Sequence, residues 1–142
     1  MTEFRLTGLA AFLTEATVEM EHAKHAALEK AAVIVEDGSK KAIGTYEFGW
    51  PPLAESTKRD RVNKGFAEDE PLLRTGELRD SIRHEVEGDT ARVGSDLDYA
   101  LYQEVGTSRI PPRSFLMQSA VHHRDEIVHE IGETMATKLV NG

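Results

Sequence analysis

The stretch from Leu72 to Leu116 constrains the fold of this chain most, because its structural preference changes several times within a short length. A short helical run, Thr75–Ile82, precedes two alternating segments that flank Gly88-Asp89, a two-residue hairpin signal. A second short helical run, Tyr99–Val105, is then followed by glycine and a pair of prolines. This order predicts short helices and a small antiparallel sheet between longer elements.

In the predicted short helix Thr75–Ile82, the sequence indicates both the residue that caps the helix and the face that it buries. Thr75 is a capping residue, and Glu77 in the first turn favours the positive end of the helix dipole. Leu78 and Ile82 are four residues apart, so they are expected to share a buried face. In the hairpin segments that follow, His84 and Val86 alternate with charged residues, which predicts a sheet with one covered face.

Two long helices are predicted on either side of this stretch. Residues 8–42 lack proline and are rich in alanine, glutamate, leucine and lysine. The pair Asp37-Gly38 predicts the main break of this helix, with one further turn before Gly44. Its length leaves two interpretations open, a surface helix with one buried side or a stripe that partly faces a partner. The apolar stripe is Leu9, Leu13, Ala16, Met20, Ala23, Ala27, Ala31 and Ile34.

The second long helix is expected over residues 114–140, downstream of the prolines. Before it, Asp98 is predicted to cap the helical turn at Tyr99–Val105, and Gly106 to end that turn in a left-handed conformation. The stripe of the second helix is Leu116, Ala120, Ile127, Ile131, Met135 and Leu139, with Phe115 and Val128 beside it. We therefore predict one α+β domain over residues 1–142, with two long helices packed on a small antiparallel sheet.

Residues 44–71 are predicted to form a long, mobile connection. Ser56 or Thr57 could cap a short basic helix within it. Trp50 either covers the edge of the core or presents a platform to a ligand or partner, and the core position is the favoured interpretation. The candidate assembly interface comprises Trp50, Pro51, Pro52, Leu53, Gly106, Thr107, Arg109, Ile110 and Arg113.

Composition excludes several classes of function. The chain has no cysteine, which rules out disulfides and thiolate metal sites. Its formal net charge of −8 disfavours a nucleic-acid-binding field over the whole surface. No apolar run is long enough to span a bilayer and no secretory signal is visible, so we expect an intracellular product without a membrane partner.

A metal site is the main alternative function. Glu19 and His22, and likewise Glu126 and His129, have the Glu-x-x-His spacing found on facing helices of di-iron carboxylate proteins. Both pairs are out of phase with the apolar stripes, so they are expected to point toward solvent. We therefore predict no metal, no cofactor and no catalytic residue.

Other chemistry has little support in the sequence. No serine lies in a Gly-x-Ser-x-Gly elbow, and no phosphate-binding glycine loop is present. Four arginines could bind phosphate, but ion pairs with the excess carboxylates are the favoured use. These are Arg74, Arg79, Arg109 and Arg113.

Three short motifs, taken together in their order and spacing, resemble the tail-completion (virion morphogenesis, minor tail or neck) proteins of long-tailed bacteriophages and prophages. The first matches at Thr75, Gly76, Leu78, Ser81 and Ile82. The second matches at Tyr99, Ala100, Glu104, Gly106 and Thr107, and the third at Pro111, Arg113, Phe115 and Leu116. Ser114 stands where the family often has proline.

The resemblance implies a structural, non-catalytic subunit of a virion, assembled in the host cytoplasm. Family members form rings around the DNA channel, which implies a homomeric ring, hexameric on assembly. The expected partners are a head-side adaptor or stopper, a tail-side terminator or tube protein, and DNA as a passive neighbour.

Overall fold

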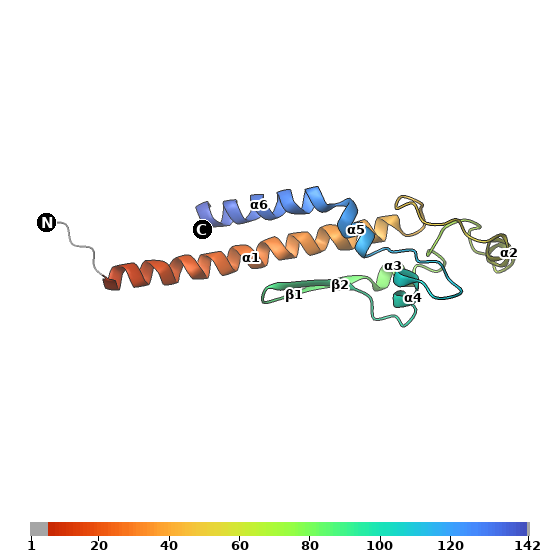
Figure 1. Ribbon diagram of the computed structural model, residues 1–142, viewed down its shortest axis with the longest axis horizontal. Helices are drawn as coiled ribbons and strands as arrows, with labels where there is room; N and C mark the ends of the chain where they lie inside the picture. Colours follow the sequence, from red (N-terminus) through yellow and green to blue (C-terminus); the bar gives the residue numbers. More distant parts are fainter. Residues whose placement is uncertain (1–5, 142) are drawn as a thin grey trace.

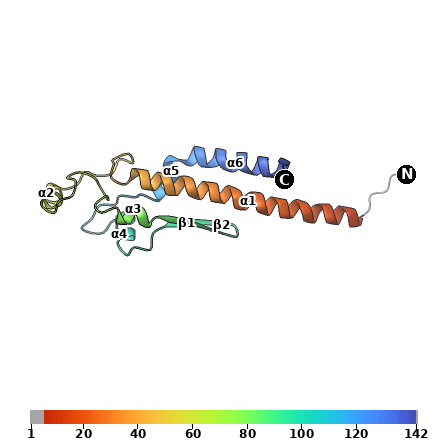
Figure 2. The ribbon, with the colours of Figure 1, turned by 180° about the vertical axis from the view of Figure 1, so that it is seen from behind.

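The computed structural model describes the backbone of residues 6–141 and the side chains of residues 18–137. Helix α1 (Leu6–Ala42) forms the axis of an elongated molecule and is about 55 Å long at 1.5 Å per residue. Helices α5 (Met117–His122) and α6 (Arg124–Asn141) lie along one side of α1, and the β1–β2 hairpin lies along the opposite side (Figures 1 and 2). The fold is therefore α+β, as predicted.

The α1 helix continues through Asp37-Gly38, so the predicted break there is wrong. Gly38 is buried, and a Cβ atom at this position would lie 2.7 Å from Cε1 of His123. The missing side chain lets α5 approach the α1 backbone, where the Ser119 hydroxyl donates to the carbonyl of Val35 at 2.8 Å. Glycine thus serves helix packing here and does not end the helix.

The α1 stripe is buried only where other elements cover it. Ala23 and Ala27 are buried, whereas Met20 is 52% exposed. The N-terminal part of α1 extends beyond the hairpin and α6 (Figure 1), so nothing within the described subunit covers its outer turns. The side chains of Leu9, Leu13 and Ala16, and of Leu139 in the second stripe, lie outside the described residues.

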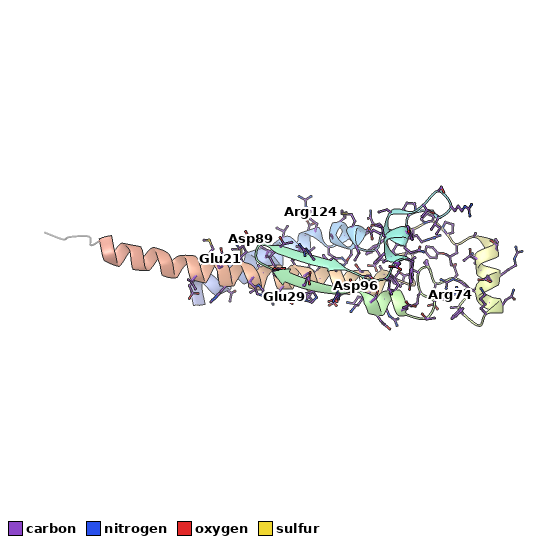
Figure 3. The ribbon with its side chains drawn as sticks, turned by 90° about the horizontal axis from the view of Figure 1, so that it is seen from below. Glu21, Glu29, Arg74, Asp89, Asp96 and Arg124 are labelled. Carbon is purple, nitrogen blue, oxygen red and sulfur yellow. The ribbon has the colours of Figure 1, made fainter. Side chains whose placement is uncertain are left out.

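The hairpin confirms the alternation predicted for it. Strands β1 (Arg83–Glu87) and β2 (Thr90–Gly94) pair antiparallel, with His84 opposite Val93 and Val86 opposite Ala91. These four side chains are half-buried toward α1. Asp89 in the turn of the hairpin is labelled in Figure 3, and its carboxylate forms an ion pair with Lys24 of α1 at 2.5 Å. Residues 6–141 contain no third strand in this sheet.

The main core lies at the C-terminal end of α1. Phe115 is fully buried at its centre, and Leu78 and Ile82 bury the shared face predicted for them. Trp50 also belongs to this core, so the interpretation that it covers the core edge is confirmed. The remaining buried members are Ala42, Ile43, Phe48 and Ala100.

The C-terminal helix is not continuous, contrary to the prediction over 114–140. Helix α5 ends at His122, the C-cap residue His123 has a φ of −105° and a ψ of 15° that depart from helical geometry, and α6 begins at Arg124. The face turned toward α1 includes the buried polar residues Ser119 and Thr134, which the apolar stripe did not include. Val128 is 62% exposed, so it lies away from that face.

The connection from 44 to 71 contains helix α2 (Glu55–Asn63), which is longer than the predicted basic turn. Its N-cap is Ala54, and neither Ser56 nor Thr57 caps it. The two ends of the connection are joined to each other, because Gly44 donates its N–H to the carbonyl of Pro71 at 2.8 Å.

The two other short helices match the predicted positions but not every cap. The N-cap of α3 (Glu77–Ser81) is Gly76 and not the predicted Thr75, although the Thr75 hydroxyl accepts the N–H of Glu77 at 3.3 Å. Helix α4 (Ala100–Val105) has Tyr99 at its N-cap and no side-chain cap, so Asp98 does not cap it. Gly106 has the predicted positive φ of 75°, but its ψ of 174° is extended and not left-handed helical.

Candidate functional site

A groove of about 670 Å³ lies at the end of the molecule that carries α2, α3 and α4. We call it the α2–α4 groove. Arg74, one of its lining residues, lies between α2 and α3 in Figure 3. The apolar part of the lining includes Pro52, Leu53, Leu72, Leu78, Ile110 and Pro111. The charged part is Asp60, Arg61, Arg74, Glu77, Arg109 and Arg113.

This groove brings together residues that the sequence analysis singled out in separate segments. From the three motifs it contains Thr75, Gly76, Leu78, Tyr99, Pro111 and Arg113. From the candidate assembly interface it contains Pro52, Leu53, Arg109, Ile110 and Arg113. The tertiary fold therefore joins the connection before α2 with the loop that follows α4.

Glu104 links the second motif to the third. Its carboxylate accepts the backbone N–H groups of Phe115 at 3.0 Å, Leu116 at 2.8 Å and Met117 at 3.2 Å, and it also accepts the hydroxyl of Ser114. These N–H groups lie just before α5 or at its first residue, where a helix offers no backbone acceptor of its own. The Glu104 side chain of α4 therefore supplies the hydrogen-bond acceptor for the start of the next helix. This contact sets the position of α5 relative to α4.

Arg113 links the third motif to the proline pair. Its guanidinium donates to the carbonyl of Pro51 at 3.0 and 3.2 Å and to that of Pro52 at 3.1 Å. Nearby, the indole N–H of Trp50 donates to the carbonyl of Ser114 at 2.9 Å. These bonds hold the two edges of the groove together across more than 60 residues of sequence.

The candidate assembly residues therefore divide into two groups. Trp50, Leu53 and Arg113 are mostly buried and support the fold of the subunit, and of these three Leu53 and Arg113 also line the groove. The exposed members are Pro51, Pro52, Thr107 and Arg109, and Gly106 and Ile110 are half-buried.

Beside the groove, α4 and α5 carry large apolar side chains that face solvent. Leu101 and Val105 of α4 are 62% and 61% exposed, and Met117 of α5 is 64% exposed. The bond from Met117 N–H to Glu104 keeps these two helices adjacent. We call the set the α4–α5 apolar residues, and it comprises Tyr99, Leu101, Tyr102, Val105, Met117 and Val121. Tyr99, Tyr102 and Val105 of this set are therefore all exposed to solvent.

The groove is lined by more arginines than carboxylates, whereas the whole chain has a net charge of −8. Arg61 and Arg113 are each 7% exposed, and neither has a carboxylate within ion-pair distance among the described side chains. Burial is the main cause that lowers the pKa of Arg61, with the charge of Arg74 adding to it. Arg74 itself pairs with Asp60 at 3.1 Å, and Arg79 pairs with Asp80 at 3.1 Å, as expected for these two. For Arg113, the expected carboxylate partner is replaced by backbone carbonyls.

The remaining motif residues support the fold around the groove. Gly76 has a φ of 89°, a conformation that favours glycine. The Ser81 hydroxyl donates to the carbonyl of Leu78 at 2.6 Å and lies 2.6 Å from the hydroxyl of Ser95. The Thr107 hydroxyl accepts the N–H of Arg109 at 3.2 Å, which shapes the loop after α4.

The two Glu-x-x-His pairs lie away from the helix interfaces. His22, Glu126 and His129 are exposed, as the phases read from the sequence predict, whereas Glu19 is half-buried and its neighbour Met20 in the predicted stripe is exposed. In the part of the chain that the structure describes, no group of three or more metal-ligating side chains comes together. The same described part has no helix with the length and apolar character needed to cross a membrane.

One polar cluster was not found from the sequence. His84 of β1 lies 2.5 Å from Glu29 through Nε2 and 2.8 Å from Glu36 through Nδ1. The hydrogen bonds to Glu29 and Glu36, in that order, raise the pKa of His84 above its ordinary value. The two glutamates are seven residues apart on α1, but no local signal connects them to a histidine 48 residues further along the chain.

Comparison of the chain with protein-family models, with curated proteins and with solved structures finds no match. The family resemblance therefore depends on the three motifs alone.

Proposed function

We propose that this protein is a structural subunit of a phage-like particle, a tail-completion or head–tail joining subunit in the neck. In this proposal it has no enzymatic activity. Copies of the subunit form a closed ring, hexameric on assembly, between a head-side adaptor or stopper and a tail-side terminator or tube protein. The ring surrounds the DNA channel of the virion and assembles in the host cytoplasm.

The observation that carries the proposal is the exposure of the α4–α5 apolar residues beside the motif contacts. Glu104 positions α5 against α4, and this arrangement presents Leu101, Val105 and Met117 to solvent. Exposed apolar side chains gathered on adjacent elements are typical of protein–protein contact surfaces. The motif residues thus act as internal supports of a surface suited to assembly.

The shape and charge of the subunit are consistent with a ring. A ring requires a heterologous interface, in which one patch meets a different patch on the next subunit. The backbone of the outer turns of α1 extends past α6 and the hairpin in Figure 1, and in this proposal it provides the second contact, distant from α4 and α5. With a net charge of −8, a channel lined by such subunits would repel the DNA backbone, so the duplex could slide through it.

The test is complementation of the particle whose genome encodes the chain. Leu101→Glu places a charge on the proposed surface, and Val128→Glu on α6 is a matched control, because both residues are 62% exposed. We expect Leu101→Glu to leave circular dichroism unchanged but to yield heads and tails that do not join. Val128→Glu should give joined particles.

Electron microscopy of the particle provides the decisive measurement. The proposal requires density for this subunit in the neck or at the tail end. Joined, infectious particles that lack the protein, or that form normally with Leu101→Glu, would contradict it. Trp50→Ala is not a suitable probe of assembly, because Trp50 is buried in the core of the subunit.

A further inference from the structure

We propose that the α2–α4 groove binds an extended acidic peptide segment of a partner protein, with Arg61 and Arg113 receiving its carboxylates. The proposed function identifies that partner as a neighbour in the particle, so the partner's location rests on the proposed function. The binding of an acidic peptide to the groove does not depend on the proposed function.

The first support is the unbalanced charge in the groove wall. Four arginines and two acidic residues line it, in a chain whose net charge is −8. Arg74 is already paired with Asp60, but Arg61 and Arg113 have no carboxylate within ion-pair distance among the described side chains, and the charges of Glu70 and Asp69 act on Arg61 only from further away. A guanidinium that is more than nine-tenths buried and still charged has lost most of its hydration. A carboxylate that entered the groove would compensate this loss.

The second support is the set of donors that remain available. Arg61 uses Nη1 for the carbonyls of Leu73, at 2.8 Å, and Ala67, at 3.4 Å. Arg113 uses Nε and Nη2 for the prolines, which leaves its Nη1 unassigned. No fully buried side-chain nitrogen in the described residues lacks a partner. The unassigned donors therefore reach solvent, and both arginines line the groove.

The third support concerns the class of ligand. The groove has a volume of about 670 Å³, within the range of sites that enclose a small ligand or a few residues of peptide. Leucine, isoleucine and proline side chains form much of its wall, which suits apolar side chains on either side of a carboxylate. A nucleic-acid strand carries a phosphate at every nucleotide, so it would place more negative charge against Asp60, Glu77 and the acidic surface of the chain than a peptide with spaced carboxylates.

The experiment uses the full chain and a synthetic probe, acetyl-Leu-Glu-Pro-Leu-Glu-Leu-amide. Two controls are the same peptide with glutamine in place of glutamate and a single-stranded thymidine oligonucleotide. Trp50 is the only tryptophan and lies next to Pro51, whose carbonyl binds Arg113, so its fluorescence reports on the groove. Calorimetry measures the affinity independently.

We expect the glutamate peptide to bind at least about tenfold more tightly than the glutamine peptide, and the difference to shrink at high salt. Arg109→Ala, an exposed change in the groove, should weaken binding several-fold without affecting the fold. Arg113→Lys should weaken it by about tenfold or more, because one compact ammonium group cannot both hold the carbonyls of Pro51 and Pro52 and reach a carboxylate in the groove. Arg92→Ala on the exposed face of β2 is the matched control and should leave binding unchanged.

Equal binding of the two peptides, no binding of the glutamate peptide at millimolar concentration, or displacement by the oligonucleotide would overturn the proposal. Retained affinity in a folded Arg113→Lys protein would also overturn it. Particle complementation separates this proposal from the proposed function. If Arg109→Ala loses peptide binding while neck assembly proceeds normally, the ring subunit stands and the acidic partner segment is not required for joining.

Discussion

The Glu104 carboxylate accepts the backbone N–H of Leu116 at 2.8 Å, and this bond joins the end of α4 to the start of α5. The same side chain also accepts the amides of Phe115 and Met117, so a single carboxylate replaces the caps that α5 lacks. Two motifs that are separate in sequence thereby form one structural unit, which supports both the groove and the exposed face of α4.

Replacement of Glu104 by Gln should destabilise the protein by about 1–3 kcal/mol, because the backbone donors lose a charged acceptor in a half-buried position. Urea denaturation measures the change. Glu68→Gln, at an exposed position in the connection, is the control and should stay within about 0.5 kcal/mol of the parent. A Glu104→Gln protein as stable as that control would show that the cap contributes little.

Gly38→Ala should destabilise the protein even though alanine favours helix. The new Cβ would lie 2.7 Å from Cε1 of His123, and it would also meet the hydroxyl of Ser119. Gly132→Ala in α6 is a matched helical control, because no atom lies within 4 Å of the added Cβ. That control should stabilise the protein by about 0.5–1 kcal/mol. Thermal unfolding measures the change in Tm of both variants. A Gly38→Ala protein with a raised Tm would contradict the close packing of α1 and α5.

Trp50→Ala should lower the free energy of unfolding by about 3–5 kcal/mol, because it opens a cavity in the core and removes the bond to the Ser114 carbonyl. Denaturation followed by circular dichroism measures this loss. Val62→Ala, in α2, is the control, because Val62 is 54% exposed and its truncation opens no cavity. If Trp50→Ala were as stable as Val62→Ala, the indole would not be part of the core.

His84 makes the attachment of the hairpin to α1 dependent on pH. Because Glu29 and Glu36 raise its pKa in the folded state, its contribution to stability is fully present below the unfolded pKa of about 6.5. The contribution is lost as the pH rises through the folded-state pKa. We therefore expect the difference in Tm between the parent and His84→Gln to be largest near pH 6 and to shrink toward pH 9. A difference that does not vary with pH over this range would refute the charged contact.

The connection from Gly44 to Pro71 should contain the fastest-exchanging amides of the free subunit, as its glycine, proline and charge content predicts. Within it, we expect the exposed residues Ala67, Glu68 and Asp69 to exchange fastest, because their N–H groups have no backbone acceptor among the described residues, whereas those of Lys64, Gly65 and Phe66 do. Hydrogen exchange measured by mass spectrometry tests this. Protection there equal to that of the α1 segment around Ala32 would contradict the prediction.

The sequence by itself determined the elements whose signals are local. Alternation on both sides of Gly88-Asp89 was sufficient to predict the hairpin and its covered face. The spacing of Leu78 and Ile82 predicted their shared burial, and the phases of the Glu-x-x-His pairs predicted the exposure of three of those four side chains. In each case the period of the backbone decides which residues share a face, so neighbours along the chain carry the information.

The tertiary structure decided what distant segments do to one another. In the sequence, Gly38 predicts a helix break. In the structure it lies within α1, where the close approach of α5 leaves no room for a Cβ atom. The sequence predicts an ion pair for Arg113, but the fold brings its guanidinium to the carbonyls of Pro51 and Pro52. His84 contacts two glutamates of α1 only after the hairpin has packed against that helix. These contacts join residues 48–84 positions apart, and no local period encodes them, because they exist only when the layers on both sides of α1 have assembled.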